Sequence, residues 1–377
     1  MSTNTTEQRS ETRSPKNQNS LTSGQRPKWL IPAILVGSIV VGAALAALVS
    51  FSVALWAVFA AVIFLIAAPI AVTSIEGSRQ GKNAALTYLV YGAFIVAVIP
   101  LISVIWTVLF RGIPTLSPEL LTTTMSSVTA IDDQQSVENG TGVQGGILHA
   151  IVGSVIVTLC ATIISVPIGL LTAIYQVEYS NGNTLSKIIT FLVDVMTGIP
   201  SIVAGLFASA LFTIILGQQG VRMGIVGAVA LTVLMIPTVV KSTEEMLKVV
   251  PNELREASYA LGVRKWRTIL KVVIPTAISG IAAGVTLAIA RVIGETAPLM
   301  VTIGFLDSMN ANPFHDWMSS LPTFIYQQLM RPISPTTPDP STDRAWAAAL
   351  VLIVFVMLLN LAARLIANAF APKTAGR

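Results

Sequence analysis

The chain has 377 residues, of which 53% are hydrophobic and 11% charged, with a net charge of +5 and a mean hydropathy of +0.75. Soluble domains carry about 25% charged residues, so this composition excludes an ordinary soluble protein and predicts an integral membrane protein. The single cysteine, Cys160, excludes an intrachain disulfide and a thiolate metal site, and the two histidines, His149 and His315, have no ligand spacing.

Residues 1–28 form a polar N-terminal segment, rich in Ser, Thr, Asn, Gln and charges. Such a composition cannot offset its ordering entropy by burial, so we predict a disordered cytoplasmic tail. The apolar run after Trp29 is too long for a cleaved secretory signal and lacks a clear cleavage pattern. We therefore interpret it as the first membrane segment.

Membrane-spanning helices need roughly 20 apolar residues each, because the bilayer core is about 30 Å thick. Eight runs of suitable length occur, near 29–50, 51–72, 84–110, 146–174, 188–216, 223–240, 276–303 and 345–370. They predict an all-α, polytopic membrane protein.

The first two runs join around Ser50 and Ser52 with almost no polar spacer. Residues 29–83 are therefore expected to form an additional N-terminal transmembrane hairpin, although one long or re-entrant element also fits. Residues 84–370 would supply six core spans, and residues 371–377 a short cytoplasmic tail.

Lys and Arg residues predict the orientation, because positive loops stay on the cytoplasmic side. With residue 1 inside, eighteen of the 23 basic residues fall on cytoplasmic segments, four fall outside, and Arg291 lies within the membrane. This places the 241–275 loop in the cytoplasm. The 111–145 and 304–344 loops, both net acidic, lie outside.

Two charged residues, Arg291 and Glu295, interrupt the apolar run 276–303. A charge in a membrane span costs about 2.5–3.5 kcal/mol by insertion scales and usually marks a substrate path. Arg291 is fifteen residues into this run, roughly 22 Å deep in a helix, and its planar guanidinium suits oxyanions. Glu295, one helical turn further, would hold Arg291 when the path is empty. A permanent ion pair that only locks helix packing is the alternative.

Asp194, in the run 188–216, is a weaker path candidate, and a partner for Lys187 or for a cation at a subunit interface is the alternative. In the same run, Gly198 and Pro200 are expected to interrupt the helix and free backbone amides. Gly280 and Gly284 permit close helix contact, which is common in any membrane bundle.

The 241–275 loop carries the strongest pattern in the sequence. Pro251 is suited to open a helix and Gly262 to close one. Between them, Leu254, Ala257 and Leu261 make a narrow apolar stripe at helical spacing. This pattern predicts a short surface helix built for docking. A helix lying on the inner leaflet is the alternative.

Glu256-Ala257-Ser258, Gly262 and the later Ile274-Pro275 resemble the EAA loop of binding-protein-dependent ABC import permeases. In that family the loop forms a coupling helix that sits in a groove of the ATPase subunit, and Ser258 stands where the second Ala is usual. The resemblance implies a type I ABC importer permease fold. The ATPase-coupling residues that it implies are Glu256, Ala257, Leu261, Gly262 and Pro275.

Residues 111–117, 197–207 and 290–299 resemble the phosphate-specific permeases of the PstA family, over roughly residues 84–370. The resemblance implies the permease subunit of an ATP-driven phosphate importer in a bacterial or archaeal cell membrane, with Arg291, Glu295 and Asp194 along the phosphate path. Its partners would be a PstC-like permease, two PstB-like ATPases, an external PstS-like binding protein and membrane lipid, and no nucleic acid. A permease for another oxyanion and an ion-coupled secondary transporter are the alternatives.

A nucleotide-binding loop is not evident in the sequence. Gly77 to Asn83 is the nearest match to a phosphate-cradling loop, but it has the wrong spacing and no hydroxyl after its Lys. We therefore expect a non-enzymatic subunit without its own cofactor, with ATP bound and hydrolysed by partner subunits.

Overall fold

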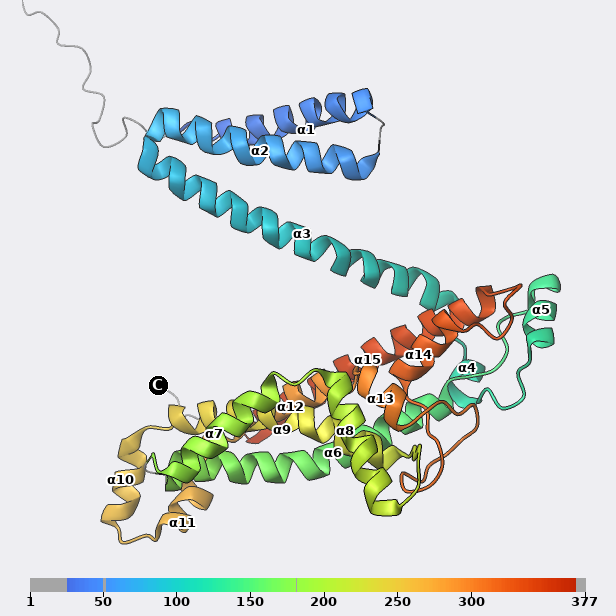
Figure 1. Ribbon diagram of the computed structural model, residues 1–377. Helices are drawn as coiled ribbons and strands as arrows, with labels where there is room; N and C mark the ends of the chain where they lie inside the picture. Colours follow the sequence, from blue (N-terminus) through green and yellow to red (C-terminus); the bar gives the residue numbers. More distant parts are fainter. Residues whose placement is uncertain (1–25, 50–51, 181, 371–377) are drawn as a thin grey trace, which may run out of the picture. The chain divides into compact units, whose positions relative to one another are not determined.

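The computed structural model describes residues 26–49, 52–180 and 182–370, and within these ranges every regular element is a helix (Figure 1). The all-α prediction is thereby confirmed. Most of the predicted 1–28 tail and all of the 371–377 tail lie outside the described residues. The chain divides into two compact units, Met1–Val104 and Ile105–Arg377.

The first unit contains helices α1 (Leu30–Val49) and α2 (Val53–Glu76) and most of α3 (Ser78–Thr115). Helices α1 and α2 lie side by side as separate helices (Figure 1). Their contact depends on a small residue, because a Cβ added at Gly42 would lie 2.7 Å from the backbone nitrogen of Ala60. Each of the three helices is long and apolar enough to cross a membrane.

The second unit is built around α6 (Leu148–Ile174), α9 (Gly224–Val249), α12 (Ile274–Val292) and α15 (Asp339–Phe370). Together with the first unit, seven helices meet the length and hydropathy of a membrane span in the described part of the chain. A bent pair, α7 (Thr184–Thr197) and α8 (Ser201–Leu216), provides an eighth candidate. The eight predicted runs therefore all correspond to helical segments.

Two of the predicted runs are broken in the structure. The run 188–216 bends by 109° between α7 and α8, where Gly198 and Pro200 stand, as their presence predicted. The run 276–303 is not continuous either. Helix α12 ends at Val292, and a separate short helix, α13 (Ala297–Thr302), follows after a turn that contains Glu295.

Close packing between α9 and α12 rests on the two glycines singled out in the sequence. A Cβ added at Gly280 would lie 2.2 Å from the Met246 sulfur, and one at Gly284 would lie 2.4 Å from the Ser242 hydroxyl oxygen. Small residues let two membrane helices pack closely. Inside a bilayer no hydrophobic effect drives helices together, so this close packing is what stabilises the pair. The predicted role of these glycines in packing is confirmed.

The remaining short helices are α4 (Pro118–Thr122) and α5 (Ala130–Glu138) before α6, α10 (Asn252–Ala260) and α11 (Lys265–Thr268) between α9 and α12, and α14 (Leu321–Met330) before α15. One-turn π-helices, Tyr175–Tyr179 and Ile269–Val273, extend α6 and join α11 to α12.

Candidate functional site

A cavity of about 260 Å³ lies where the end of α7, the middle of α9 and the last turn of α12 meet. Its lining residues are Met196, Thr197, Ile199, Leu234, Pro237, Thr238, Lys241, Ser242, Glu245 and Arg291. We call this cavity the cationic pocket, because Arg291 and Lys241 outnumber Glu245 among its charged side chains. The hydroxyls of Thr197, Thr238 and Ser242 add neutral hydrogen-bonding groups.

Arg291 reaches the cationic pocket from the last turn of α12, where a positive charge also suits the helix dipole. One guanidinium nitrogen donates a hydrogen bond to the Thr238 hydroxyl of α9 at 3.4 Å. The rest of the guanidinium has no recorded partner among the described residues, and the side chain is exposed to the pocket. Arg291 is therefore placed to receive a ligand oxygen.

Glu295 does not occupy the position that helical spacing assigned to it. Helical spacing predicts Glu295 on the same face as Arg291, but α12 ends three residues before Glu295. The backbone N–H of Glu295 donates to the Val292 carbonyl in the following turn. In the described part of the chain Arg291 and Glu295 form no ion pair with each other, and Glu295 does not line the cationic pocket.

Asp194 pairs with a cation of α9. The Lys241 Nζ lies 2.9 Å from the Asp194 Oδ1, and both side chains remain about half exposed. Neither Lys187 nor Arg291 is its recorded partner. Asp194 thus lies beside the cationic pocket and holds one of its two cations.

Sequence reasoning missed Lys241 because it assigned this residue to the cytoplasmic loop 241–275. In the structure α9 continues to Val249, so Lys241 is a helical residue. A signal was present, since Lys241 and Ser242 lie three and four residues after Thr238 and four and three residues before Glu245, so the four residues share a face. That face forms one wall of the cationic pocket.

Helix α10 confirms the short surface helix predicted between Pro251 and Gly262. Pro251 precedes its first turn, and Gly262 follows its end with a φ of +73°, a conformation that strains other residues. The predicted stripe faces away from the described chain, with Leu254 41% and Leu261 83% exposed. Glu256 and Ala257 are also exposed.

Pro275 does not mark the end of a loop. The chain is already helical from Lys265 onward through α11 and the π-helix, and Pro275 stands in the first turn of α12. The helices therefore leave only residues 250–264, with α10 among them, as the segment between α9 and α11.

Arg255 donates five hydrogen bonds, and four of them fasten α10 to the end of α9 and to the π-helix after α6. It donates to the Glu178 carboxylate at 2.8 and 3.1 Å, to the Leu247 and Val250 carbonyls at 2.9 and 2.6 Å, and to the Asn252 side chain at 3.2 Å. Glu178, on the π-helix after α6, is 7% exposed. The last carbonyls of a helix lack partners within it, so Arg255 satisfies the end of α9 as well as the buried carboxylate.

Ser258 stands where the EAA loop usually has its second Ala, and its side chain has a specific partner. Its hydroxyl lies 2.8 Å from the Thr268 hydroxyl of α11, and both residues are buried. This contact closes the turn between α10 and α11. A hydroxyl at position 258 is therefore explained by the hydroxyl at position 268.

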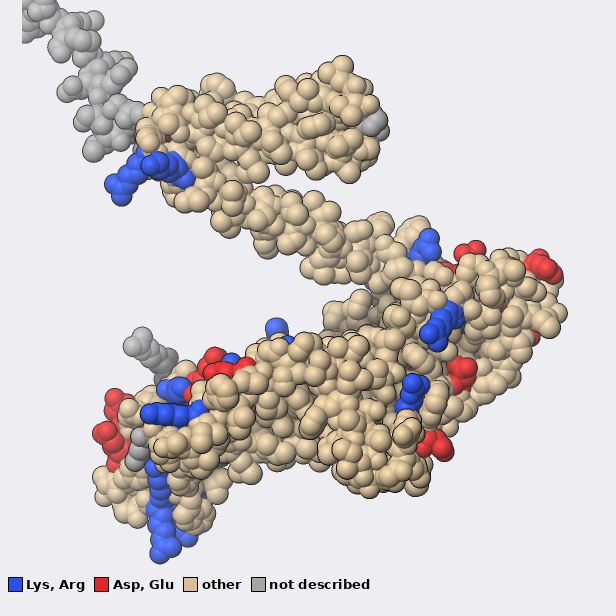
Figure 2. All heavy atoms as spheres, viewed as in Figure 1, with Lys and Arg blue, Asp and Glu red and all other residues tan. Residues whose placement is uncertain are grey.

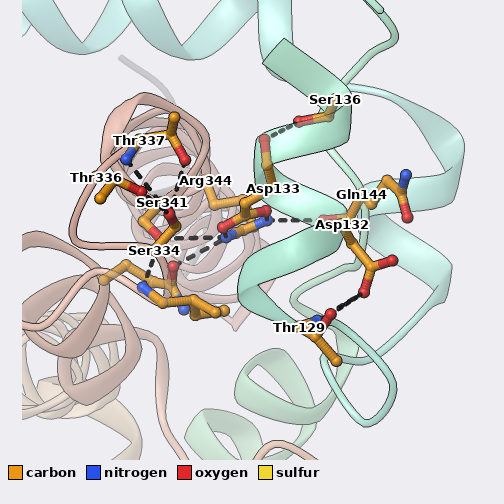
Figure 3. Close-up of polar contacts among 12 residues, drawn as sticks. Thr129, Asp132, Asp133, Ser136, Gln144, Ser334, Thr336, Thr337, Ser341 and Arg344 are labelled. Carbon is orange, nitrogen blue, oxygen red and sulfur yellow. Dashed lines mark hydrogen bonds and ion pairs between the residues drawn. The ribbon is translucent and has the colours of Figure 1, made fainter. Parts of the chain in front are cut away.

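A second buried ion pair fixes the opposite part of the second unit (Figure 3). Arg344 of α15 donates to both carboxylate oxygens of Asp133 on α5, at 2.6 and 2.8 Å, and neither side chain is exposed. The Gln144 carbonyl, the Gln328 amide oxygen and the Ser341 hydroxyl accept from the same guanidinium. From the sequence, Arg344 is only the last residue of the outer loop 304–344. Its pairing with Asp133 could not be predicted from local patterns, because 211 residues separate the two partners.

Comparison with known proteins adds the family. Residues 165–376 match the family described as binding-protein-dependent transport system inner membrane component. A protein of Mycobacterium tuberculosis named phosphate transport system permease protein PstA 1 is 43% identical over 76% of this chain and 89% of its own length. PstA proteins of Mycobacterium leprae and Pasteurella multocida are 42% and 36% identical over 75% and 76% of this chain, and 88% and 95% of theirs.

The family match over residues 165–376 includes the cationic pocket and α10. The described helices and the exposed α10 are what the resemblance in the sequence led us to expect, and the bent pair is what Gly198 and Pro200 led us to expect. The chain belongs to the family of binding-protein-dependent transport system inner membrane components and, within it, to the PstA permease proteins.

Proposed function

We infer that this chain is a membrane subunit of an ATP-driven importer and that its substrate is phosphate. Relatives named as phosphate transport permeases support the substrate. The observation that carries the inference within this chain is the cationic pocket, where Arg291 and Lys241 face a cavity lined by hydroxyls. A cavity of this chemistry suits a small, multiply charged oxyanion.

The pocket offers two kinds of contact to phosphate. The planar fork of Arg291 can bind two phosphate oxygens at once, while the ammonium of Lys241 acts as a point charge. Asp194 neutralises Lys241 and Glu245 opposes both cations. A path must bind its ion strongly enough to admit it and weakly enough to release it, so these carboxylates would keep phosphate from being trapped.

Energy for transport would come from partner subunits. The exposed stripe of α10, with Glu256, Ala257 and Leu261, would dock in the ATPase, and Gly262 would set the turn that follows. The complete importer would contain a second, PstC-like permease, two PstB-like ATPases that bind the ATP, and an external PstS-like phosphate-binding protein. This chain would lie in the cell membrane with its N-terminus and α10 on the cytoplasmic side, in agreement with its Lys and Arg distribution.

Phosphate uptake by cells that depend on this importer tests the pocket. Arg291→Lys keeps the charge but loses the fork, and Lys241→Met removes the second cation. We expect each to lower uptake at least about tenfold, since a hydrogen bond to a charged group contributes roughly 1.5–3 kcal/mol. Lys187→Gln, which changes an exposed lysine away from the pocket lining, is the matched control.

Membrane abundance and assembly must be equal across the variants. Full uptake by both Arg291→Lys and Glu295→Gln would show that Arg291 and Glu295 do not contribute to the phosphate path. Full uptake by Lys241→Met would show the same for Lys241. Loss of uptake on ATP depletion with the ion gradient intact separates an ATP-driven importer from an ion-coupled transporter.

A further inference from the structure

The first unit contains an apolar groove that shares no lining residue with the cationic pocket. It has a volume of about 590 Å³ and lies between α2 and α3, with Leu35 of α1 at its margin. The α3 residues that line it, among them Tyr88, Gly92 and Ile99, recur at helical spacing and so share one face. A face of α2 that includes Ala61 and Leu65 forms the other wall.

Side chains bridge the groove in the part nearer the turn between α2 and α3. Its walls touch through the rings of Phe64 and Tyr88, whose centroids are 5.3 Å apart, and through Leu65, which lies 3.7 Å from a Cβ added at Gly92. Toward the turn between α2 and α3 the helices close completely, with Thr73 against Gly81. A helix with its side chains is about 10–12 Å across. A slot bridged by side chains instead suits a flexible hydrocarbon chain.

The end of the groove near Tyr88 is positively charged. An Arg26 guanidinium nitrogen lies 3.5 Å from the Tyr88 hydroxyl, and Arg26 also pairs with Glu76 at 3.8 Å. Lys28, Arg79 and Lys82 are exposed in the same unit, at the start of α1 and in the first turns of α3, and they leave a net positive charge there. Figure 2 shows Lys and Arg side chains gathered where α2 passes into α3.

We propose that this groove binds an anionic phospholipid, with one acyl chain between α2 and α3 and the headgroup at Arg79 and Lys82. The apolar groove suits the acyl chain of this ligand, and the cations suit its anionic headgroup. Lys82 precedes Tyr88 by six residues and Arg79 precedes it by nine, about 9 Å and about 14 Å along a helix, so the cations stand roughly two turns before the groove begins. The 67% exposed Trp29, near the same end, is a residue type that favours the headgroup level.

The test is native mass spectrometry of the full-length chain, with whatever subunits remain attached, titrated with phosphatidylglycerol and with phosphatidylcholine of the same acyl chains. We expect one saturable phosphatidylglycerol site and weaker phosphatidylcholine binding. The double change Arg79→Gln and Lys82→Gln should lower phosphatidylglycerol affinity roughly 30-fold, because each basic residue near a membrane surface strengthens anionic lipid binding several-fold. The same double change at Lys187 and Lys271 should lower it little.

Filling the groove separates a bound acyl chain from headgroup attraction alone. Ala61→Trp should abolish the saturable site, whereas Val62→Trp, on the adjacent but non-lining position of α2, should preserve it. Gly92→Leu serves the same purpose should Ala61→Trp fail to fold. Equal affinity for the two lipids, or an unchanged site in the folded groove variant, would overturn the proposal.

A photo-crosslinking residue at position 61 identifies the occupant in native membranes. Crosslinks to phospholipid support the proposal, and crosslinks to polypeptide instead would overturn it by showing a protein segment in the groove. Phosphate uptake is not the readout of these experiments, so their outcome is independent of the proposed transport function.

Discussion

Arg255 and Glu178 provide the sharpest test of how α10 is held. Glu178→Gln keeps the shape of the side chain but removes its charge, so the two hydrogen bonds from Arg255 lose the charge on their acceptor. Charge-assisted hydrogen bonds are about twice as strong as neutral ones, and each contributes roughly 1.5–3 kcal/mol. We therefore expect α10 to lose about 1–2 kcal/mol of local stability.

The reciprocal change should be more severe. Arg255→Met leaves the Glu178 carboxylate buried without its cation and removes the donors to the Leu247 and Val250 carbonyls. Removing one partner of a buried pair costs about 3–5 kcal/mol, and the slight exposure of Arg255 places this case toward the lower end. The structure thus predicts an asymmetry between two changes to one ion pair.

Hydrogen exchange of backbone amides in α10 and in the last turn of α9 measures both effects. Exchange through local opening should accelerate roughly 5- to 30-fold in Glu178→Gln and more than about 100-fold in Arg255→Met. Lys248→Gln is the control, because Lys248 forms an exposed pair with Glu244 on the same helix, and such pairs contribute little. Exchange in Arg255→Met no faster than in Lys248→Gln would refute the proposed attachment.

Three further changes test individual contacts. Asp133→Ala should destabilise the second unit by about 3–5 kcal/mol, seen as a lower Tm, because Arg344 is left buried without its carboxylate; an unchanged Tm would contradict this. Gly262→Ala should cost about 1–2 kcal/mol at its φ of +73° and speed amide exchange in α10, whereas unchanged exchange would show that the turn relaxes. Ser258→Ala should speed that exchange several-fold by leaving the Thr268 hydroxyl buried and unpaired, and adding Thr268→Val should restore much of the protection; no rescue would exclude the hydroxyl pair as the cause.

The long helices and the short surface helix α10 could be predicted from the sequence because both depend on local patterns. Apolar length predicts the spans. Pro251 and Gly262 predict the ends of α10 since their backbone preferences act within a few residues. The break between α7 and α8 was predictable for the same reason, from Gly198 and Pro200.

The charged contacts were not predictable, because they depend on how distant segments pack. Lys241 was assigned to a loop on the evidence of its charge, yet α9 continues past it and Asp194 on α7 neutralises it. Glu295 was placed by extrapolating a helix that ends at Val292. In the first case the predicted helix ended too early, and in the second it ended too late. Helix ends are the least reliable feature of such patterns.

Helix α9 connects α10 to the cationic pocket, and this connection suggests how the docking of a partner at α10 would change the pocket. Lys241 and Glu245 line the pocket, and Leu247, two residues further on, gives its carbonyl to Arg255 of α10. Six residues separate Lys241 from Leu247, about 9 Å along the helix axis. A movement of α10 would therefore pull on the end of α9 through Arg255 and shift Lys241 relative to Asp194 on α7 and Arg291 on α12. Because the Lys241 pair is half exposed, a small shift would let Lys241 exchange Asp194 for a phosphate oxygen in the proposed path, whereas the buried Arg255 contacts would transmit the movement without breaking.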